Sequence, residues 1–196
     1  MNLPLIVLIN CETLISFSNL SRFQIKISVI TLLTDFGSNS IQTARAKAWL
    51  MRHFPSHPVL DIAHDIHPND INEAAYVFNM VHNQFAPETI HLVAIDFDTR
   101  NIHNEIVYFK INDQHVFTYN SGIASLILNQ NIADVFYVEQ YTGRHYDSLV
   151  DAFGPVVNAF KNVSLSDKLV PINDKANIKT PFNPVRTEKL LQGHVM

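Results

Sequence analysis

The sequence predicts a layered α/β domain in which helices flank a mostly parallel or mixed central sheet. From Ser28 onward, apolar runs of strand length alternate with segments whose apolar residues recur at helical spacing. The continuous apolar runs at 28–34 and 89–96 are typical of buried strands. The chain has 196 residues, of which 47% are hydrophobic, so it can bury one core of ordinary size.

The first half of this domain contains the clearest helix signals. The strand at 28–34 ends at the polar turn "DFGSNS", and a helix is expected from about residue 40 to 54. A short strand at 58–63 follows. The next helix begins at Asp70, because Asp70 and Glu73 have the spacing of a capping box and helical periodicity follows them.

The second half predicts a hairpin and then shorter elements. The runs "EIVYFKI" and "HVFTY" are expected to pair as strands joined by the turn "NDQ". A short helix at 122–129, a strand at 134–139 and a helix at 148–160 follow. Residues 171–189 hold three prolines and little apolar periodicity, which is typical of a linker, and 190–196 begin a further strand.

We expect residues 1–27 to be an N-terminal extension to the domain at 28–170. Their apolar run is too short to span a bilayer, and it lacks the preceding basic residues and the cleavage pattern of a signal peptide. Two interpretations stay open, a peripheral strand and an extension from an upstream start codon.

The charge and cysteine content exclude several classes of function. A net charge of −4 without any run of Lys or Arg provides no basic field for nucleic acid, and no membrane partner is expected. The single cysteine, Cys11, excludes an intrachain disulfide framework and a cysteine-cluster zinc site, which fits a cytoplasmic protein. The chain has only five glycines and no nucleophile-elbow or phosphate-cradling motif.

Three aspartates lie at or near the carboxyl ends of predicted buried strands: Asp35, Asp61 and Asp96. Ligands of open α/β sheets bind in the crevice outside those ends, so the three carboxylates are candidates for one shared pocket. Each also has a purely local interpretation. Asp35 could cap the following helix, Asp61 could bind amides of its own loop, and Asp96 could begin a turn.

A metal site is the alternative suggested by His64, Asp65 and His67. Imidazole and carboxylate groups hold divalent ions in metal-dependent hydrolases, where the His-Asp pair lies on a helix. Here the pair follows a strand and precedes Pro68, and the other histidines show no ligand spacing. The histidines therefore fit a polar loop better than a metal site, and we expect no metal.

The order of several motifs resembles the SAM hydroxide adenosyltransferase family, which is related to the SAM-dependent fluorinases and chlorinases. The blocks are "ITLLTDFGSNS", "VLDIAHDIHPNDINEAAYVF", "FAPETIHLVAID" and "VFTYNSGIASLI", and they span about Val29 to Leu169. They match T-D-F-G, D-I-T-H with P-x-D-I, F-P-x-G-T-V-H-L with V-D-P-G-V-G, and P-D-N-G-L. The order of the blocks carries the resemblance, because each block alone is weak.

The resemblance implies a SAM hydrolase-like activity, in which hydroxide or water attacks the ribose C5′ of S-adenosylmethionine and releases adenosine and L-methionine. S-adenosylmethionine would be the substrate, and no cofactor is implied. If the chain is an enzyme, it is an adenosine-forming SAM hydrolase; a non-catalytic remnant with the same fold is the second hypothesis. The metal-dependent hydrolase using His64, Asp65 and His67 is the third.

The resemblance also implies site residues. Asp61 matches the aspartate of D-I-T-H, which belongs to a group that orients or activates water, and is the catalytic candidate. The implied substrate-binding positions are Asp35, Ser40, Gln42, Asp96, Asn120 and Ser121. The pattern also has departures, because Pro68 stands where the family has an arginine seven positions after the aspartate, and Leu149 and Val150 replace its later Gly-Arg pair.

The family's second, β-rich domain begins with a strand similar to "GHV" near the end of this chain. In the family, the active site lies between the first domain of one subunit and the second domain of a neighbour in a homotrimer. We expect residues 190–196 to be a truncated start of that second domain, which would remove its contacts to adenine and methionine.

Overall fold

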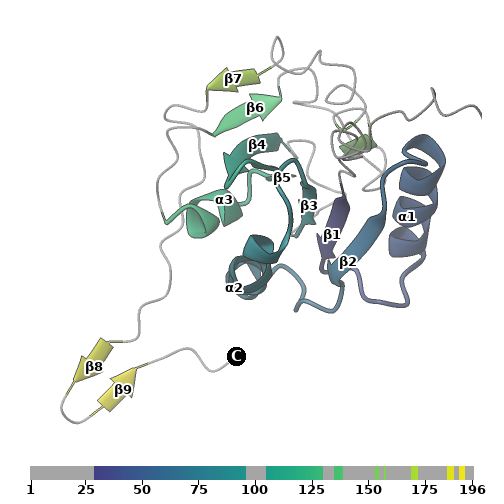
Figure 1. Ribbon diagram of the computed structural model, residues 1–196. Helices are drawn as coiled ribbons and strands as arrows, with labels where there is room; N and C mark the ends of the chain where they lie inside the picture. Colours follow the sequence, from purple (N-terminus) through teal and green to yellow (C-terminus); the bar gives the residue numbers. More distant parts are fainter. Residues whose placement is uncertain are drawn as a thin grey trace, which may run out of the picture.

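A computed structural model describes residues 29–95, 105–129, 135–138, 153–154, 157, 169–171, 185–187 and 190–192. Within them, seven strands form one sheet in the order β2-β1-β3-β5-β4-β6-β7 (Figure 1). The strands are β1 (Ile30–Thr34), β2 (Val59–Ala63), β3 (Ile90–Ala94), β4 (Ile106–Ile111), β5 (Gln114–Tyr119), β6 (Phe136–Val138) and β7 (Leu169–Pro171). A separate two-stranded sheet contains β8 (Val185–Thr187) and β9 (Leu190–Gln192).

The sheet is mixed, as the alternation of patterns predicted. Strands β2, β1, β3 and β5 are parallel neighbours, whereas β4 is antiparallel to β5 and to β6, and β6 is antiparallel to β7. The α/β layered fold class is therefore confirmed. Strand β8 lies inside the segment that the prolines indicated as a linker, and β9 opens the strand expected at 190–196.

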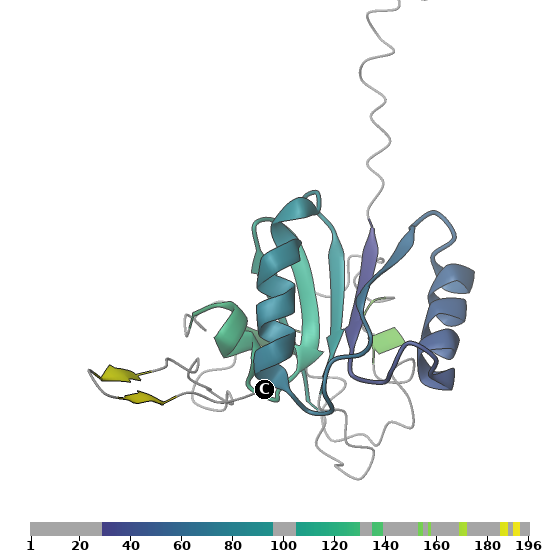
Figure 2. The same ribbon diagram turned by 90° about the horizontal axis from the view of Figure 1, so that it is seen from below.

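Helices cover both faces of the sheet. The helices are α1 (Ile41–His53), α2 (Ile71–Val81) and the short α3 (Ile123–Ile127), with a 3₁₀ turn, η3 (His82–Gln84), directly after α2. Buried residues of α1 share one apolar cluster with Ile30 and Leu32 of β1, and those of α2 and α3 share the other cluster with Leu33. Figure 2 accordingly shows α1 and α2 on either side of β1 and β2.

Local side-chain bonds explain where the two long helices begin. Ser40 caps α1, and its Oγ accepts a hydrogen bond from the Gln42 amide at 3.1 Å. Asp70 caps α2 and accepts hydrogen bonds from the amides of Asn72 and Glu73, both at 3.0 Å. The expected capping box is only half formed, because the Glu73 carboxylate accepts from the amide and ring of His67 rather than from Asp70.

The β4–β5 hairpin has a tighter turn than expected. Asn112 and Asp113 both have positive φ angles, 49° and 59°, as a two-residue type I′ turn requires. Gln114 is therefore the first residue of β5 and not part of the turn. Of the helix expected at 148–160, the described residues Phe153, Gly154 and Val157 are helical, and the rest lie outside the described part of the chain. No helix among the described residues is long and apolar enough to cross a bilayer.

A buried polar network crosses the α2 face near the amino ends of the strands. His91 of β3 contacts Thr31 Oγ1 at 2.7 Å through Nδ1 and Gln114 Oε1 at 3.2 Å through Nε2. The Gln114 amide donates to the carbonyls of His82 and Phe85. Burial lowers the pKa of His91 to about 4, so this imidazole is neutral in the folded protein at neutral pH.

Acidification should therefore destabilise the fold through His91. Its folded pKa lies below the unfolded value of 6.5, so the unfolded state binds the extra proton as pH falls from 6.5 to about 4. We expect the free energy of unfolding to fall by roughly 3 kcal/mol across this window. Denaturant titrations at pH 7, 6, 5 and 4 measure it, and His91→Gln, which does not titrate, should flatten the slope. A slope that His91→Gln leaves unchanged contradicts the assignment.

His67 should change the pH dependence of stability in the opposite direction to His91 in the same titrations. Hydrogen bonding to the Glu73 carboxylate raises the pKa of this exposed imidazole. Its stabilising contribution is therefore present below pH 6.5 and is lost as pH rises through the folded pKa. His67→Gln should make stability fall more steeply on acidification, whereas His91→Gln makes it fall less.

Gly154 is in close contact with α1. A Cβ atom built at Gly154 would lie 2.9 Å from two ring carbons of Trp49, which packs against the apolar cluster on the α1 face. We expect Gly154→Ala to displace the indole and to lower the free energy of unfolding by roughly 1–3 kcal/mol. Trp49 is the only tryptophan, so its emission should shift together with the melting temperature.

A double mutant, Trp49→Phe with Gly154→Ala, distinguishes the effect of this contact on stability from the effect of the change in helix propensity. In a Trp49→Phe background the smaller ring leaves room for the new methyl group, so Gly154→Ala should cost less there. An equal cost in both backgrounds, measured by circular dichroism, would show that the Trp49 contact is not the cause.

Candidate functional site

The topology opens a crevice at the carboxyl ends of β1 and β2. These strands are parallel neighbours, but the loop after β1 leads to α1 on one face and the loop after β2 leads to α2 on the other. The strand order reverses at β1, and open α/β sheets bind ligands outside the carboxyl ends of the strands near such a reversal; this crevice lies on its β2 side. A cavity of about 500 Å³ lies there, and its polar lining includes Ser38, Lys47, Asp61, His64, Asp65 and Glu73.

Two backbone-mediated contacts hold the loops of the crevice together. The Gly37 amide donates to the His64 carbonyl at 2.7 Å, and the Ser38 amide donates to Asp65 Oδ1 at 2.8 Å. The Ser38 hydroxyl donates to the other oxygen of Asp65, and these hydrogen bonds lower the pKa of that carboxyl. Gly37 has a φ of +88°, which side chains strongly disfavour, so this turn requires glycine.

Asp35 ties the β1 loop to the segment that enters α2. Its Oδ2 accepts a hydrogen bond from the Asn69 amide at 2.9 Å, and Asn69 itself has a φ of +64°. Asp35 is half-buried and does not cap α1, a role that Ser40 fills. The local interpretation of Asp35 as a helix cap is therefore wrong.

Asp61, the catalytic candidate, lies in the middle of β2 and not at its end. Lys47 Nζ of α1 lies 2.6 Å from Asp61 Oδ2. His64 Nε2 lies 3.1 Å from Asp61 Oδ1, but its N–H does not point along that line, so this contact is an electrostatic approach and not an aligned hydrogen bond. Burial raises the pKa of Asp61, and Lys47 and His64 together more than offset this, so the net pKa is lowered.

His64 links Asp61 to β1. It is 6% exposed, and its Nδ1 lies 2.9 Å from Thr34 Oγ1. The sequence indicated a loop histidine here or, in the alternative hypothesis, a metal ligand, and Lys47 was not singled out at all. One signal for Lys47 was its place four residues after Thr43 on the sheet-facing stripe of α1.

The crevice is acidic at neutral pH. The pKa values of Asp61, Asp65 and Glu73 are all lowered, by Lys47 and His64, by Ser38 and by His67 respectively. Lys47 is the only lysine or arginine among its described lining residues. Three carboxylates and one ammonium group favour a ligand that carries positive charge.

Two further predicted binding residues, Asn120 and Ser121, lie along the same edge. Asn120 and Ser121 follow β5, two strand positions from β1, which corresponds to roughly 10 Å. The Asn120 side chain donates to Glu105 Oε2 at 3.0 Å. Gln42 Oε1 and Ser121 Oγ are buried and have no hydrogen-bond partner among the described residues. Asp96 lies outside the described part of the chain.

The metal alternative finds no support in the side-chain arrangement. Each of its three residues is turned to a different partner: His64 to Thr34 and Asp61, Asp65 to Ser38, and His67 to Glu73. Among the described residues, no group of three or more histidine, cysteine or acidic side chains could hold a metal ion.

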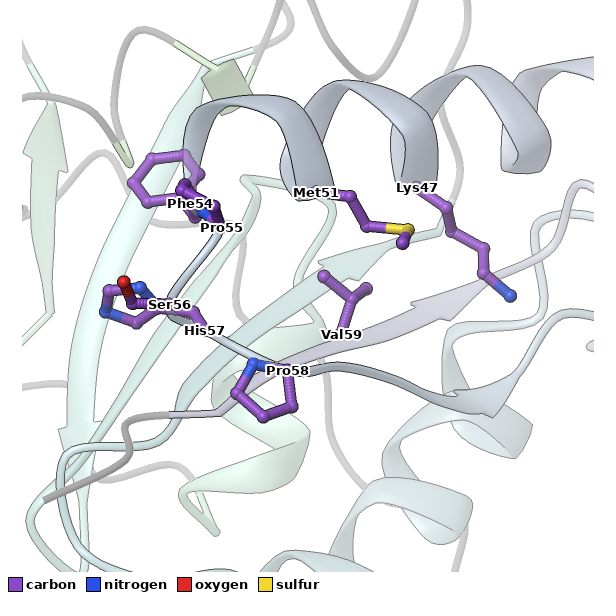
Figure 3. Close-up of a pocket in the computed structure, with 8 residues that line it drawn as sticks. All are labelled: Lys47, Met51, Phe54, Pro55, Ser56, His57, Pro58 and Val59. Carbon is purple, nitrogen blue, oxygen red and sulfur yellow. The ribbon is translucent and has the colours of Figure 1, made fainter. Parts of the chain in front are cut away.

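A second hollow of about 390 Å³ lies farther along α1, toward the amino end of β2. Figure 3 shows Met51, Phe54, Pro58 and Val59 around it, with Lys47 at one end. Its lining is largely apolar and contains no carboxylate. The crevice with Asp61 is therefore the better candidate for chemistry.

The fold and the crevice define an α/β domain with a polar crevice at the carboxyl edge of its sheet. A family model described as the SAM hydroxide adenosyltransferase N-terminal domain matches residues 30–164, more than half of the chain. The chain therefore belongs to the SAM hydroxide adenosyltransferase family, through the N-terminal domain of that family. This finding confirms the family resemblance of the sequence motifs.

Two solved structures share the fold. An uncharacterized conserved protein from Thermotoga maritima matches with a TM-score of 0.65 and 23% identity, over 81% of this chain and 64% of that one. A conserved hypothetical protein from Thermus thermophilus matches with a TM-score of 0.54 and 19% identity, over 78% and 62%. The chain thus spans less than two thirds of the length of either protein.

The contact between the two loops should respond to removal of the Ser38 hydroxyl. Ser38→Ala deletes one of the two hydrogen bonds to Asp65, so the Gly37 amide should exchange with solvent faster. Hydrogen exchange followed by mass spectrometry measures this in peptides covering 35–40 and 62–66. Ser56→Ala, an exposed serine of the second hollow, is the control. Equal exchange in the unaltered protein, Ser38→Ala and Ser56→Ala would show that the hydrogen bonds between Ser38 and Asp65 do not hold the loops together.

Proposed function

We propose that the crevice binds S-adenosylmethionine and that water attacks its ribose C5′, giving adenosine and L-methionine. The observation that carries the proposal is the ionised Asp61 carboxylate, held by Lys47 and His64 in an acidic crevice of a domain from this family. A sulfonium substrate supplies the positive charge that such a crevice favours.

The chemistry needs no nucleophilic side chain. The oxygen of water forms a bond to C5′ while the C5′–S bond breaks. The electron pair of the C5′–S bond stays on sulfur and neutralises the sulfonium as methionine leaves. The proton of the attacking water passes to Asp61 and then to solvent, so the reaction releases one proton. Aligning water with the C5′–S bond and excluding bulk water then supply most of the acceleration.

The remaining predicted residues have roles in binding within this proposal. Asp35 accepts hydrogen bonds from the ribose hydroxyls, and Asp96, Asn120 and Ser121 contact the rest of the nucleoside. Gln42 and Ser121 support this role, because a ligand would provide partners for their buried oxygen atoms. Ser40 acts mainly by beginning α1 beside the crevice.

Asp61→Asn tests the proposal most directly. The amide keeps the size of the side chain but cannot accept the proton, so we expect turnover of S-adenosylmethionine to fall roughly 10²-fold or more. Adenosine formation is followed by chromatography, and binding is followed by the thermal shift with S-adenosylmethionine. Binding should persist in the variant, since Asp61 acts on water.

Asp113→Asn is the matched control, because Asp113 is an exposed aspartate in the β4–β5 turn. It should turn over at the rate of the unaltered protein. Absence of both turnover and a thermal shift in the unaltered protein would refute the proposal and favour a non-catalytic domain.

A further inference from the structure

We infer that Lys47 is a positioning residue, which orients the Asp61 carboxylate and thereby selects the proton-bearing nitrogen of His64. The inference rests on the proposed function for its catalytic consequence. Its structural part concerns only four described side chains from three segments: Lys47 of α1, Asp61 and His64 of β2 and its end, and Thr34 of β1.

The geometry assigns one oxygen of Asp61 to each neighbour. Lys47 Nζ takes Oδ2 at 2.6 Å, which leaves Oδ1 facing His64 Nε2 at 3.1 Å. An ionised carboxylate can only accept hydrogen bonds, so the proton of a neutral His64 ring belongs on Nε2. Nδ1 is then an acceptor and receives the Thr34 hydroxyl at 2.9 Å. From Lys47 to Thr34 of β1, each contact then pairs one hydrogen-bond donor with one acceptor.

The ligand-free geometry leaves one link in this series of contacts loose. His64 Nε2 is buried and close to Oδ1, but its N–H is not aligned with that oxygen. Such contacts tighten in many active sites only when substrate binds. A small rotation of the carboxyl group can close this link, because the long Lys47 side chain can follow Oδ2 and keep the ammonium contact.

Exposure distinguishes this arrangement from an ordinary surface ion pair. The side chains of Lys47 and Asp61 are each 37% exposed, so the pair by itself contributes little to stability. His64, in contrast, is 6% exposed and has both ring nitrogens close to protein groups. The consequence of removing Lys47 should therefore appear in the ionisation of Asp61 and the tautomer of His64 rather than in the melting temperature.

The structural part is tested by NMR on the full chain without substrate. In Lys47→Met the pKa of Asp61, followed through its carboxyl carbon, should rise, because the ammonium that favours the charged form is absent. The ring of His64 should change from the Nε2–H form to a mixture of tautomers in long-range proton–nitrogen spectra. Lys47→Arg should restore both signals, and Lys110→Met, an exposed lysine of β4, should leave both unchanged.

The catalytic part is tested by the pH profile of S-adenosylmethionine cleavage. Lys47→Met should move the acid limb of kcat to higher pH and lower kcat at neutral pH roughly tenfold or more, with Lys47→Arg restoring most of the rate. An unchanged Asp61 pKa in Lys47→Met overturns the inference. If the Asp61 pKa changes in Lys47→Met but the pH profile of kcat does not, the role of Lys47 in the reaction is overturned. Absence of turnover in the unaltered protein refutes the proposed function, and the NMR arm then still decides whether Lys47 positions Asp61.

Discussion

The site depends on the parallel pairing of β1 with strands on both of its sides. Ile30, Leu32 and Leu33 are fully buried between β2 and β3, so β1 cannot shift without exposing both apolar clusters. This pairing places the carboxyl ends of β2, β1 and β3 at one edge. It also forces the loops after β1 and β2 to leave toward opposite faces, and that divergence creates the crevice in which Asp61 lies.

Hydrogen bonds and neighbouring charges keep the carboxylates of the crevice ionised below their usual pH range. Each of its three carboxylates has donors within reach that hold it ionised: Lys47 and His64 for Asp61, Ser38 for Asp65, and His67 for Glu73. A crevice of this kind would repel an anionic substrate such as a nucleotide phosphate. In the proposed reaction it would suit a sulfonium, because the positive charge disappears as the C–S bond breaks and the attacking water needs only alignment and a proton acceptor.

Most of the fold could be predicted from local patterns. The continuous apolar runs located β1 and β3, and the side chains of Ser40 and Asp70 cap the helices near the positions that their sequence signals indicated. The errors arose where a neighbouring contact or a backbone angle differed from the motif that the sequence indicated. Glu73 has capping-box spacing, but its carboxylate accepts from His67, whose amide lies just upstream at 2.9 Å. The two positive φ angles of Asn112 and Asp113 shortened the hairpin turn, a preference that "NDQ" carries only weakly.

The site was less predictable, because its contacts join residues far apart in the chain. Proximity to strand ends identified Asp35 and Asp61 as candidates, but Lys47 lies 14 residues from Asp61, and Thr34 lies 30 residues from His64. Only the β1–β2 register, in which Leu32 pairs with Asp61, turns the Asp61 side chain toward α1 and within reach of Lys47. An irregularity between Leu32 and Leu33 then shifts the register by one residue, so that Leu33 pairs with Ala63, and this brings His64 beside Thr34 at the end of β1. A histidine that resembles part of a polar loop in the sequence is therefore a buried link between the two strands that form the crevice.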